Sequence, residues 1–519
     1  MLTSNRFIPS FGVLASVSRL GLGLLLGLSP SCAMDDGSAS EDAVTGDEAV
    51  ITAELGSDGS SEAICNKGKF RCHARALTTA AGLRITSHAS AAAPPGFGAK
   101  DLQSAYNVDI TKTLATKPTV AIIDAYGYAT LEADLGVYRT TYGLPACTKA
   151  NGCLKVVNQL GLTSPLPGPP PPDDDWTVET ALDVDMISAL CPACNILVIQ
   201  ADDPGDGMLF GQQIAVQLGA TVISDSWGGP EAPPPNDPAD AEQYFDHAGV
   251  PTFVSAGDAG YNNQFSSNGV GPDYPGTSAH VIAVGGTRLV KDNSARGWSE
   301  TTWAPVAGNS ARGAGGSACS LSIPKPAYQT KSPCQFKATT DIAAVGDPAT
   351  GLAVYNAGNG WLVIGGTSAA APMVAAIFAA TGNAAQASGE FIASKASKLY
   401  DVTSGNNGTC GADTLLCNAA VGWDGPTGYG TPNAVALTPA PPTPSGSNSG
   451  GASDGVAQDV TGGCSIAGGA GGAGAGLWLG LALLGLRRRR TAFPRVAGAA
   501  RPHPHAALPE APGRASQRA

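Results

Sequence analysis

The chain has 519 residues, with 30 Lys or Arg, 42 Asp or Glu and only six His, and its formal net charge is −12. Residues 487–519 hold eight Arg and one Glu, so the charge of residues 1–486 is −19. Such an acidic body argues against nucleic acid as a partner, because phosphate binding needs a basic face. The length permits about three domains of ~150 residues or one longer α/β unit.

The first 32 residues have the pattern of an export signal. The apolar run Leu20–Leu28 follows Arg19, and small residues lead to Cys32. An apolar run of this length beside a positive charge is typical of a secretory signal peptide. We therefore expect residues 1–32 to be a signal peptide and the protein to be exported. Residues 33–95, rich in Ser, Ala and acidic side chains, are expected to be a linker or a short pro-segment.

Cysteine spacing supports export. Ten of the twelve Cys fall into five close pairs, which predicts short-loop disulfides in an oxidising compartment, at 65/72, 147/153, 191/194, 319/334 and 410/417. Cys191-Pro-Ala-Cys194 could instead belong to a metal or redox site. A zinc site is the weaker alternative, because no second motif of this kind and no neighbouring His accompany it.

Between residues 96 and 440, apolar strand patterns alternate with helical ones. The expected strands are 119–124, 195–200, 221–224, 251–255 and 280–284, and the expected helices are 173–190, 209–218 and 372–381. Continuous apolar strands that alternate with helices predict an α/β fold, with a doubly wound, mainly parallel sheet covered by helices on both faces.

The C-terminal region divides into three expected parts. Residues 441–463 are a Pro/Gly/Ser-rich tether. Residues 464–490 comprise Cys464, a run of 21 uncharged residues and four Arg, and such a run can span a bilayer with the Arg cluster on the cytoplasmic side. This arrangement resembles the MYXO-CTERM type of sorting signal, which implies surface anchoring through the membrane. Residues 491–519 are expected to be a disordered basic tail.

A nucleophile candidate stands where a strand meets a helix, in Gly365-Gly-Thr-Ser368-Ala-Ala-Ala-Pro372. Unpaired backbone N–H groups and the helix dipole at such a start favour a developing negative oxygen. Ser368 would then have an oxyanion donor beside it. The alternative is that Ser368 only caps the helix.

The base that would activate Ser368 is not an obvious histidine. The sequence has no His-Gly-Thr-His segment; His73 and His88 fall in the expected linker, and His247 and His280 have no distinctive motif.

Glu179 and Asp183 lie four apart, on one face of an expected helix. On a buried helix, two such carboxylates share a proton and the pKa of at least one rises; on an exposed helix they would be a solvated acidic face.

A third acid, Asp258, follows a strand in Ser-Ala-Gly-Asp258-Ala-Gly. If it is protonated, it could donate a hydrogen bond to an oxyanion, although a turn is the common use of such a motif.

Taken together, Glu179-x-x-x-Asp183, Ser-Ala-Gly-Asp258-x-Gly and Gly-Gly-Thr-Ser368-Ala-x-Ala-Pro resemble the motifs of the sedolisins, the serine-carboxyl peptidases. The resemblance covers roughly residues 97–436 and implies a subtilisin-like fold. It assigns Ser368 as nucleophile, Glu179 as general base, Asp183 as its orienting acid and Asp258 as the oxyanion-hole acid. Asp124 would be a supporting carboxylate.

The resemblance also implies one structural calcium ion near the C-terminus of the peptidase domain. Asp401 and Asp424 would supply carboxylates, and Val402, Ala420 and Gly422 would supply backbone carbonyls. Oxygen-only ligands suit Ca²⁺. Two unrelated turns are the alternative. Sedolisins usually carry a large folded pro-domain, and the segment available here is much shorter.

The sequence therefore predicts an exported or surface-anchored endopeptidase that acts on proteins or peptides through a Ser acyl-enzyme. We expect it to be monomeric and most active in acid, because the oxyanion acid must be protonated. Two alternatives stay open: a non-catalytic surface binding protein on the same scaffold, and a subtilisin-like protease that uses His247 or His280.

Overall fold

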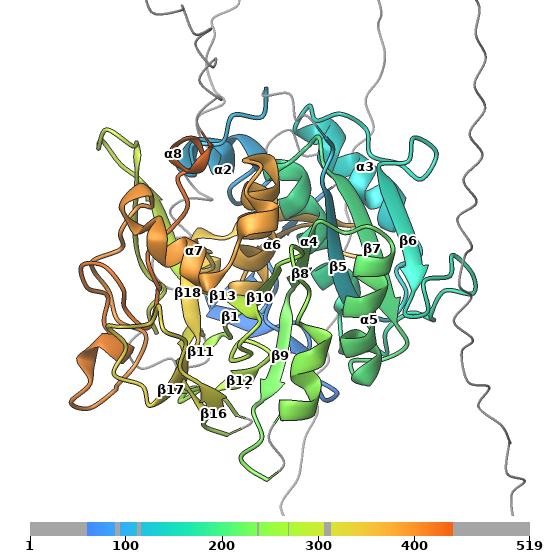
Figure 1. The fold of residues 1–519 in the computed structure, drawn as a ribbon. Helices are drawn as coiled ribbons and strands as arrows, with labels where there is room; N and C mark the ends of the chain where they lie inside the picture. The colour runs from blue at the N-terminus through green and yellow to red at the C-terminus, as the bar shows by residue number, and fades with distance from the viewer. Residues whose placement is uncertain are drawn as a thin grey trace, which may run out of the picture. The chain divides into compact units, whose positions relative to one another are not determined.

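The computed structural model describes residues 60–88, 94–111, 116–235, 238–267, 269–305 and 313–439. Its centre is an eight-stranded sheet in the order β14-β13-β10-β8-β5-β7-β6, with β18 also paired to β13 (Figure 1). The pairs are parallel except β13 with β14. The strands are β5 (Thr119–Ala125), β6 (Leu154–Asn158), β7 (Asn195–Ala201), β8 (Val222–Asp225), β10 (Thr252–Ser255), β13 (Val281–Lys291), β14 (Trp298–Thr302) and β18 (Thr340–Val345).

Helices cover both faces of this sheet, as predicted. Ile123 and Asp124 are neighbours on β5 and so point to opposite faces. The Ile123 side chain packs under Gly211 of α5, where an added Cβ would lie 2.7 Å from its Cγ2, whereas Asp124 interacts with Thr180 of α4. The α-helices are α2 (Ala99–Ala105), α3 (Leu131–Thr141), α4 (Trp176–Leu190), α5 (Asp206–Gln217), α6 (Thr367–Ala380), α7 (Gly389–Ser394) and α8 (Ala434–Leu437).

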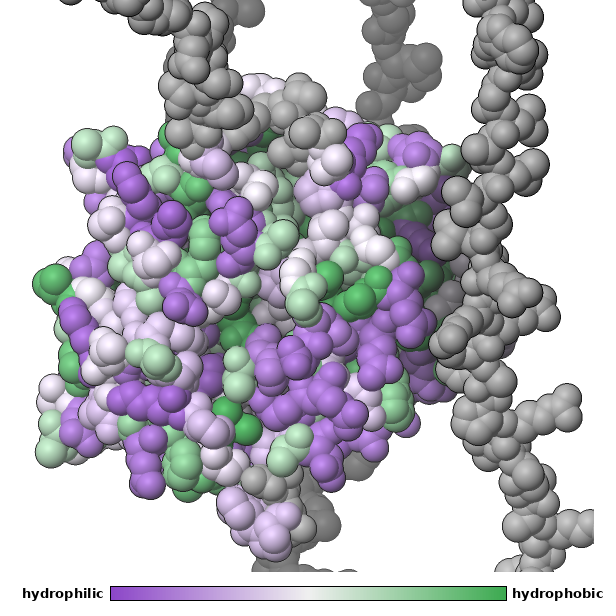
Figure 2. Space-filling model, viewed as in Figure 1, coloured by the Kyte–Doolittle hydropathy of each residue, from purple (hydrophilic) through white to green (hydrophobic). Residues whose placement is uncertain are grey.

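The two central helices differ from α5 in their surroundings. Almost every residue of α4 and α6 is buried, and the two helices pack against each other. α5 alternates buried and exposed residues, and hydrophilic side chains gather on the molecular face around it (Figure 2). The fully apolar pattern of α6 thus identifies a helix inside the protein rather than one on its surface.

A second, antiparallel sheet leads into α6. Its order is β1-β3-β20-β19, with β4 also paired to β20. Its strands are β1 (Ser60–Ala63), β3 (Arg75–Thr78), β4 (Thr86–Ser87), β19 (Leu352–Asn356) and β20 (Gly360–Gly365). Short pairings complete the fold, through β2 (Arg71–Cys72), β9 (Trp227–Pro230), β11 (Ala259–Tyr261), β12 (Asp273–Tyr274), β15 (Ala314–Ser317), β16 (Cys319–Pro324) and β17 (Phe336–Ala338).

Residues 33–95 were expected to be a linker or a short pro-segment, and the linker alternative is wrong over residues 60–87. These residues form four strands, and three of them pair with strands from the distant segments 227–230 and 360–365. This segment is held by backbone hydrogen bonds to the edges of existing sheets and by buried apolar side chains such as Ile64, Phe70 and Leu77. These apolar residues are too scattered to give a strand pattern in the sequence. Residues 33–59 lie outside the described part.

All five predicted disulfides are present: Cys65–Cys72, Cys147–Cys153, Cys191–Cys194, Cys319–Cys334 and Cys410–Cys417. Cys191 and Cys194 are therefore not available as zinc ligands. Among the described helices, none has the length and apolar character needed to cross a membrane. The predicted signal peptide and the C-terminal segments from 441 onward lie outside the described residues.

Candidate active site

Polar residues gather where three adjacent strands end. β8 pairs with both β5 and β10 in parallel, and the carboxyl ends of parallel strands share one edge of the sheet. Asp124 lies near the end of β5, Ser226 directly follows β8, and Asp258 follows β10 by three residues. The fold therefore places these three residues, which are far apart in the sequence, around one location.

The first half of α4 brings two more carboxyl groups to this edge. Glu179 and Asp183 are both fully buried. The alternative that they form a solvated acidic face on an exposed helix is therefore wrong. Asp183 Oδ1 accepts a hydrogen bond of 2.7 Å from the Ser226 hydroxyl. Both Glu179 oxygens are buried, and within the described residues neither accepts a hydrogen bond of ordinary geometry. Glu179 is thus held by packing rather than by fixed donors.

Burial makes these acids weaker than ordinary carboxylic acids. It raises the pKa of Asp124 to about 7, and the nearby Thr180 hydroxyl opposes the rise. Burial, followed by the negative charge of Asp124, raises the pKa values of Glu179 and Asp183 well above their usual range. The three groups therefore keep protons at a pH where exposed carboxyl groups have lost them.

Ser368 reaches this cluster from the start of α6. The chain leaves β20 through Gly366, whose φ of +99° suits glycine, and Ser368 is the second residue of the helix. Its hydroxyl donates to the carbonyl oxygen of Ser226 at 2.8 Å. It also lies beside Glu179, where it partly offsets the raised pKa of that carboxyl group. The predicted nucleophile and the predicted base are therefore neighbours.

Asp258 contacts Thr367, the residue before Ser368. Its Oδ1 accepts hydrogen bonds from the backbone N–H of Thr367 at 2.7 Å and from the Thr367 hydroxyl at 2.9 Å. Its Oδ2 is buried without a hydrogen-bond partner among the described residues. Burial raises the pKa of Asp258, and the charges of His73 and Arg75 oppose this rise. A protonated Oδ2 would supply a donor beside the N–H of Ser368.

Comparisons with known proteins show the family to which this fold belongs. Residues 177–424 match the model of the subtilase family. The chain is 30% identical over 391 residues to kumamolisin of Bacillus sp. strain MN-32, covering 71% of this chain and 67% of that protein. It is 32% identical over 324 residues to sedolisin of Pseudomonas sp. strain 101, covering 57% of this chain and 54% of that protein.

A solved structure of Pseudomonas sedolisin, a serine-carboxyl proteinase complexed with pseudo-iodotyrostatin, superposes with a TM-score of 0.54 at 25% identity. The match covers 67% of this chain and 98% of that structure. The chain belongs to the sedolisin family. Its fold is subtilisin-like, and its class of reaction is the hydrolysis of peptide bonds by a serine-type peptidase.

In this sedolisin-family chain, neither of the two histidines considered as a base reaches the nucleophile. His247 and His280 line a separate surface pocket with Asp246 and Glu390, and His280 Nδ1 lies 3.4 Å from Asp246. No contact joins either imidazole to Ser368 in the described part of the chain. Their position gives no support to the His-dependent alternative.

The residue that sequence reasoning missed is His73. It is buried beside Ser368, and its carbonyl oxygen accepts a hydrogen bond of 3.0 Å from the Ser368 backbone N–H. Its ring turns away from the nucleophile: Nδ1 lies 2.8 Å from the Ser255 hydroxyl and Nε2 lies 3.6 Å from Asp273. The disulfide at Cys65 and Cys72 was the one sequence signal that this segment is folded.

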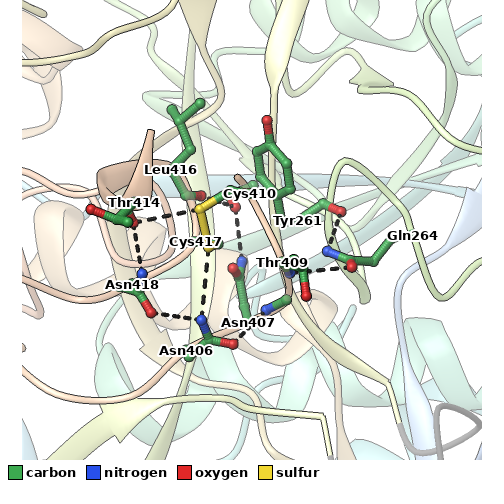
Figure 3. The surroundings of a disulfide bond; sticks show 12 residues. Tyr261, Gln264, Asn406, Asn407, Thr409, Cys410, Thr414, Leu416, Cys417 and Asn418 are labelled. Atoms are coloured by element: carbon green, nitrogen blue, oxygen red, sulfur yellow. Dashed lines mark hydrogen bonds between the residues drawn. A yellow bond between two sulfur atoms is a disulfide. The ribbon is translucent and has the colours of Figure 1, made fainter. Parts of the chain in front are cut away.

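The five residues named for calcium lie on two neighbouring loops. Asp401 accepts a hydrogen bond from the Gly422 N–H, and Asp424 accepts one from the Ala420 N–H, both at 2.9 Å. Burial, with a contribution from the charge of Asp401, raises the pKa of Asp424 to about 7. Val402 is buried next to Asp401. The Cys410–Cys417 disulfide closes a turn in the chain between these two loops. Nearby, the Asn406 side chain donates to Cys417 Sγ and to the Asn418 side chain (Figure 3).

The buried cluster predicts a pH-dependent effect of Asp124→Asn on stability. The pKa of Asp124 is about 7 in the folded protein and near 3.8 in an unfolded chain, so the folded state holds an extra proton between these values. The resulting stability is complete below about pH 4 and is lost as the pH rises through 7. The variant keeps a neutral side chain, so it should match the wild type at low pH and exceed it by roughly 2–4 kcal/mol above pH 7.

Denaturant unfolding across this pH range measures the difference. Asp240→Asn, on the exposed 3₁₀ helix at Pro238–Tyr244, is the control and should show no such trend. A variant that is less stable than the wild type at every pH would contradict the prediction.

Proposed function

We propose that this chain is an exported serine-carboxyl endopeptidase that cleaves proteins or peptides through an acyl-enzyme on Ser368. Glu179 is the general base, Asp183 orients the acidic cluster, and Asp258 is the oxyanion acid. The observation that carries the proposal is the position of the Ser368 hydroxyl at the start of α6, beside the buried Glu179 and near Asp258. Asp258 Oδ2 has no hydrogen-bond partner among the described residues and so is available to the oxyanion.

Each residue has a defined task in this mechanism. The Ser368 hydroxyl turns from the Ser226 carbonyl to Glu179, which takes its proton as the oxygen attacks the substrate carbonyl. The N–H of Ser368 and the protonated Asp258 donate to the oxyanion. Glu179 then passes the proton to the leaving amine. Asp183, held by the Ser226 hydroxyl, and Asp124 keep the cluster partly protonated beside it.

Export and attachment are parts of the same proposal. Five disulfides support folding in an oxidising compartment, in line with the signal peptide expected at 1–32. Surface anchoring through residues 464–490 and action as a monomer stand on the sequence alone. A non-catalytic binding role on this scaffold would not require the occupied set of Ser368, Glu179, Asp183 and Asp258.

We also propose one structural calcium ion held by the carboxylates of Asp401 and Asp424 and the carbonyls of Val402, Ala420 and Gly422. These residues suit the ion chemically, because every proposed ligand atom is an oxygen. The two carboxylates are also close enough for the charge of Asp401 to raise the pKa of Asp424. A bound cation would relieve that repulsion and join the two loops. It takes no part in the peptide cleavage.

Ser368→Ala is expected to abolish peptide hydrolysis, with a loss of at least about a thousandfold, because the variant lacks the oxygen that attacks the substrate. Glu179→Gln should cost a similar factor, since the amide cannot take the proton. Assays of the purified protein on denatured protein at acidic pH measure both. Ser394→Ala, on the exposed end of α7, is the control. Turnover retained by Ser368→Ala would place the nucleophile elsewhere.

Asp258→Asn is expected to move the alkaline limb of the activity profile to higher pH. The wild-type acid donates to the oxyanion only while it is protonated, so activity falls as the pH rises through its pKa, whereas the amide donates at any pH. The profile of kcat/KM against pH, from about 3 to 8, shows the shift. An unchanged alkaline limb, or a wild-type maximum in alkali, would contradict the role given to Asp258.

Removal of calcium by a chelator is expected to lower the Tm by several degrees, because a ligand that binds only the folded state stabilises it by mass action. Calcium added back should restore the Tm, and Asp424→Asn should make the protein insensitive to both treatments. Differential scanning calorimetry measures the effect. A Tm that is independent of the chelator would remove calcium from the proposal and leave the catalytic assignment untouched.

A further inference from the structure

The strand that follows Asp258 is irregular. β11 pairs with β15 in parallel, but the register shifts between Ala259 and Tyr261, so that Gly260 alone faces the two residues 315–316. Two residues opposite one make a β-bulge, which bends the strand and re-aims the side chains around it. This bulge therefore helps to set the direction of the Asp258 carboxyl group, which lies two residues before Gly260.

β15 also holds the backbone at Asp258 itself. The Ala314 N–H donates to the Asp258 carbonyl oxygen at 3.0 Å, and the Gly316 N–H donates to the Gly257 carbonyl oxygen at 2.7 Å. The carboxyl group of Asp258 faces the start of α6, where it accepts its two hydrogen bonds. A shift of β15 against α6 would therefore move this carboxyl group away from the oxyanion position.

Asn407 joins the two strands at the bulge. Its side-chain amide donates to the Gly315 carbonyl oxygen at 2.7 Å and to the Ser317 hydroxyl at 2.8 Å. Its backbone carbonyl oxygen accepts a hydrogen bond of 3.0 Å from the Tyr261 N–H. Asn407 is fully buried, and a Cβ added to Gly260 would overlap its carbonyl oxygen. One residue from a distant part of the chain is thus bonded to both β11 and β15.

An amide side chain suits this position chemically. A bulge interrupts the ladder of strand hydrogen bonds, and a buried carbonyl group without a donor is unfavourable. The amide group of Asn407 supplies two N–H donors, one for the Gly315 carbonyl and one for the Ser317 hydroxyl. An apolar side chain has no such donor, and a carboxylate would place a negative oxygen against the Gly315 carbonyl.

Residues 404–418, here called the bracing loop, hold Asn407 in place. The Asn407 N–H donates to the Cys417 carbonyl oxygen at 3.0 Å, and the disulfide from Cys410 to Cys417 closes the loop. Asn407 lies between Tyr261 and this disulfide (Figure 3). The bracing loop also connects the two segments that carry the proposed calcium ligands.

We propose that Asn407 is a positioning residue for Asp258, the oxyanion acid, and that the bracing loop holds it at the bulge for this purpose. The proposal rests on the role of Asp258 in the proposed function. Asn407 acts only through that carboxyl group and is not one of the reacting groups.

Loss of the Asn407 amide affects turnover more than substrate binding. The oxyanion forms only on the way to the transition state, so a displaced donor lowers kcat and leaves KM nearly unchanged. A displacement of about 1 Å is enough to lower kcat by up to about a hundredfold.

The test compares full-length proteins: the wild type, Asn407→Ala, Asp258→Ala, the double variant and the control Asn383→Ala. Asn383 is also buried, and its amide also donates twice, to the Thr381 hydroxyl and to the Leu437 carbonyl oxygen, both at 3.0 Å. The control therefore removes an equivalent pair of hydrogen bonds at another place. Hydrolysis of a fluorescently labelled denatured protein at acidic pH gives kcat and KM.

Asp258→Ala is expected to lower kcat about a hundredfold and Asn407→Ala about tenfold, with KM within about twofold of the wild-type value. Asn383→Ala should keep both constants. The double variant should lie within about twofold of Asp258→Ala alone, because a residue that acts through Asp258 has nothing left to position there.

Two kinds of outcome overturn the proposal. If the losses of the two single variants multiply in the double variant, or if Asn407→Ala raises KM and leaves kcat unchanged, Asn407 does not position Asp258, and Asp258 keeps its role. If Asp258→Ala retains the full kcat, the oxyanion assignment itself is wrong, and the inference fails with it.

A second variant covers the case in which Asn407→Ala does not fold. Cys410→Ser/Cys417→Ser opens the disulfide of the bracing loop, and it should lower kcat in the same way and lose this effect in the Asp258→Ala background. The matched control is Cys147→Ser/Cys153→Ser, which opens a disulfide of similar loop length elsewhere. Equal kcat values for the two cysteine variants would contradict the role of the bracing loop.

Discussion

The burial of three carboxyl groups sets the protonation of this site, because it raises their pKa values. Asp124, Glu179 and Asp183 meet between β5 and α4, where the Ser226 hydroxyl donates to Asp183 and no ion pair among the described residues neutralises the group. Each buried charge is unfavourable, and each added charge makes the next less favourable. The cluster therefore retains protons into a pH range where isolated carboxyl groups are ionised. In the proposed mechanism this cluster exchanges a proton with Ser368 without an imidazole, so the scarcity of histidine is no obstacle to it.

The approach of Ser368 to Glu179 depends on small side chains. α6 begins Thr367-Ser368-Ala-Ala-Ala-Pro, and the alanines that follow the nucleophile are fully buried. The distance between packed helices depends on the side chains at their contact, so an alanine-rich face lets α6 lie close to α4. Gly366 supplies the turn that starts α6 at this position. The alanine run thus helps to set the position of Ser368 beside Glu179.

Much of this arrangement could be predicted from local pattern. Continuous apolar runs identified β5, β7, β8 and β10, and the spacing of Glu179 and Asp183 identified one face of α4, because both signals arise within a single element. α6 begins at Thr367, next to the start expected at Ser368, although the apolar pattern itself begins only at Pro372. The strand β13 extends to Lys291, beyond the predicted 284, because it pairs with three neighbours. Such extensions depend on partners that a single segment does not reveal.

The folded segment at residues 60–87 escaped prediction for the same reason, and part of it lies against Glu179. Three of its strands pair with β9 and β20, and such backbone pairing leaves no pattern in the segment itself. The two sulfur atoms of the Cys65–Cys72 disulfide and one oxygen of Glu179 lie within 4.8 Å of one another. Part of the burial that raises the pKa of Glu179 therefore comes from this disulfide. The protonation of a residue in α4 thus depends on a segment far earlier in the chain, which no pattern around Glu179 could reveal.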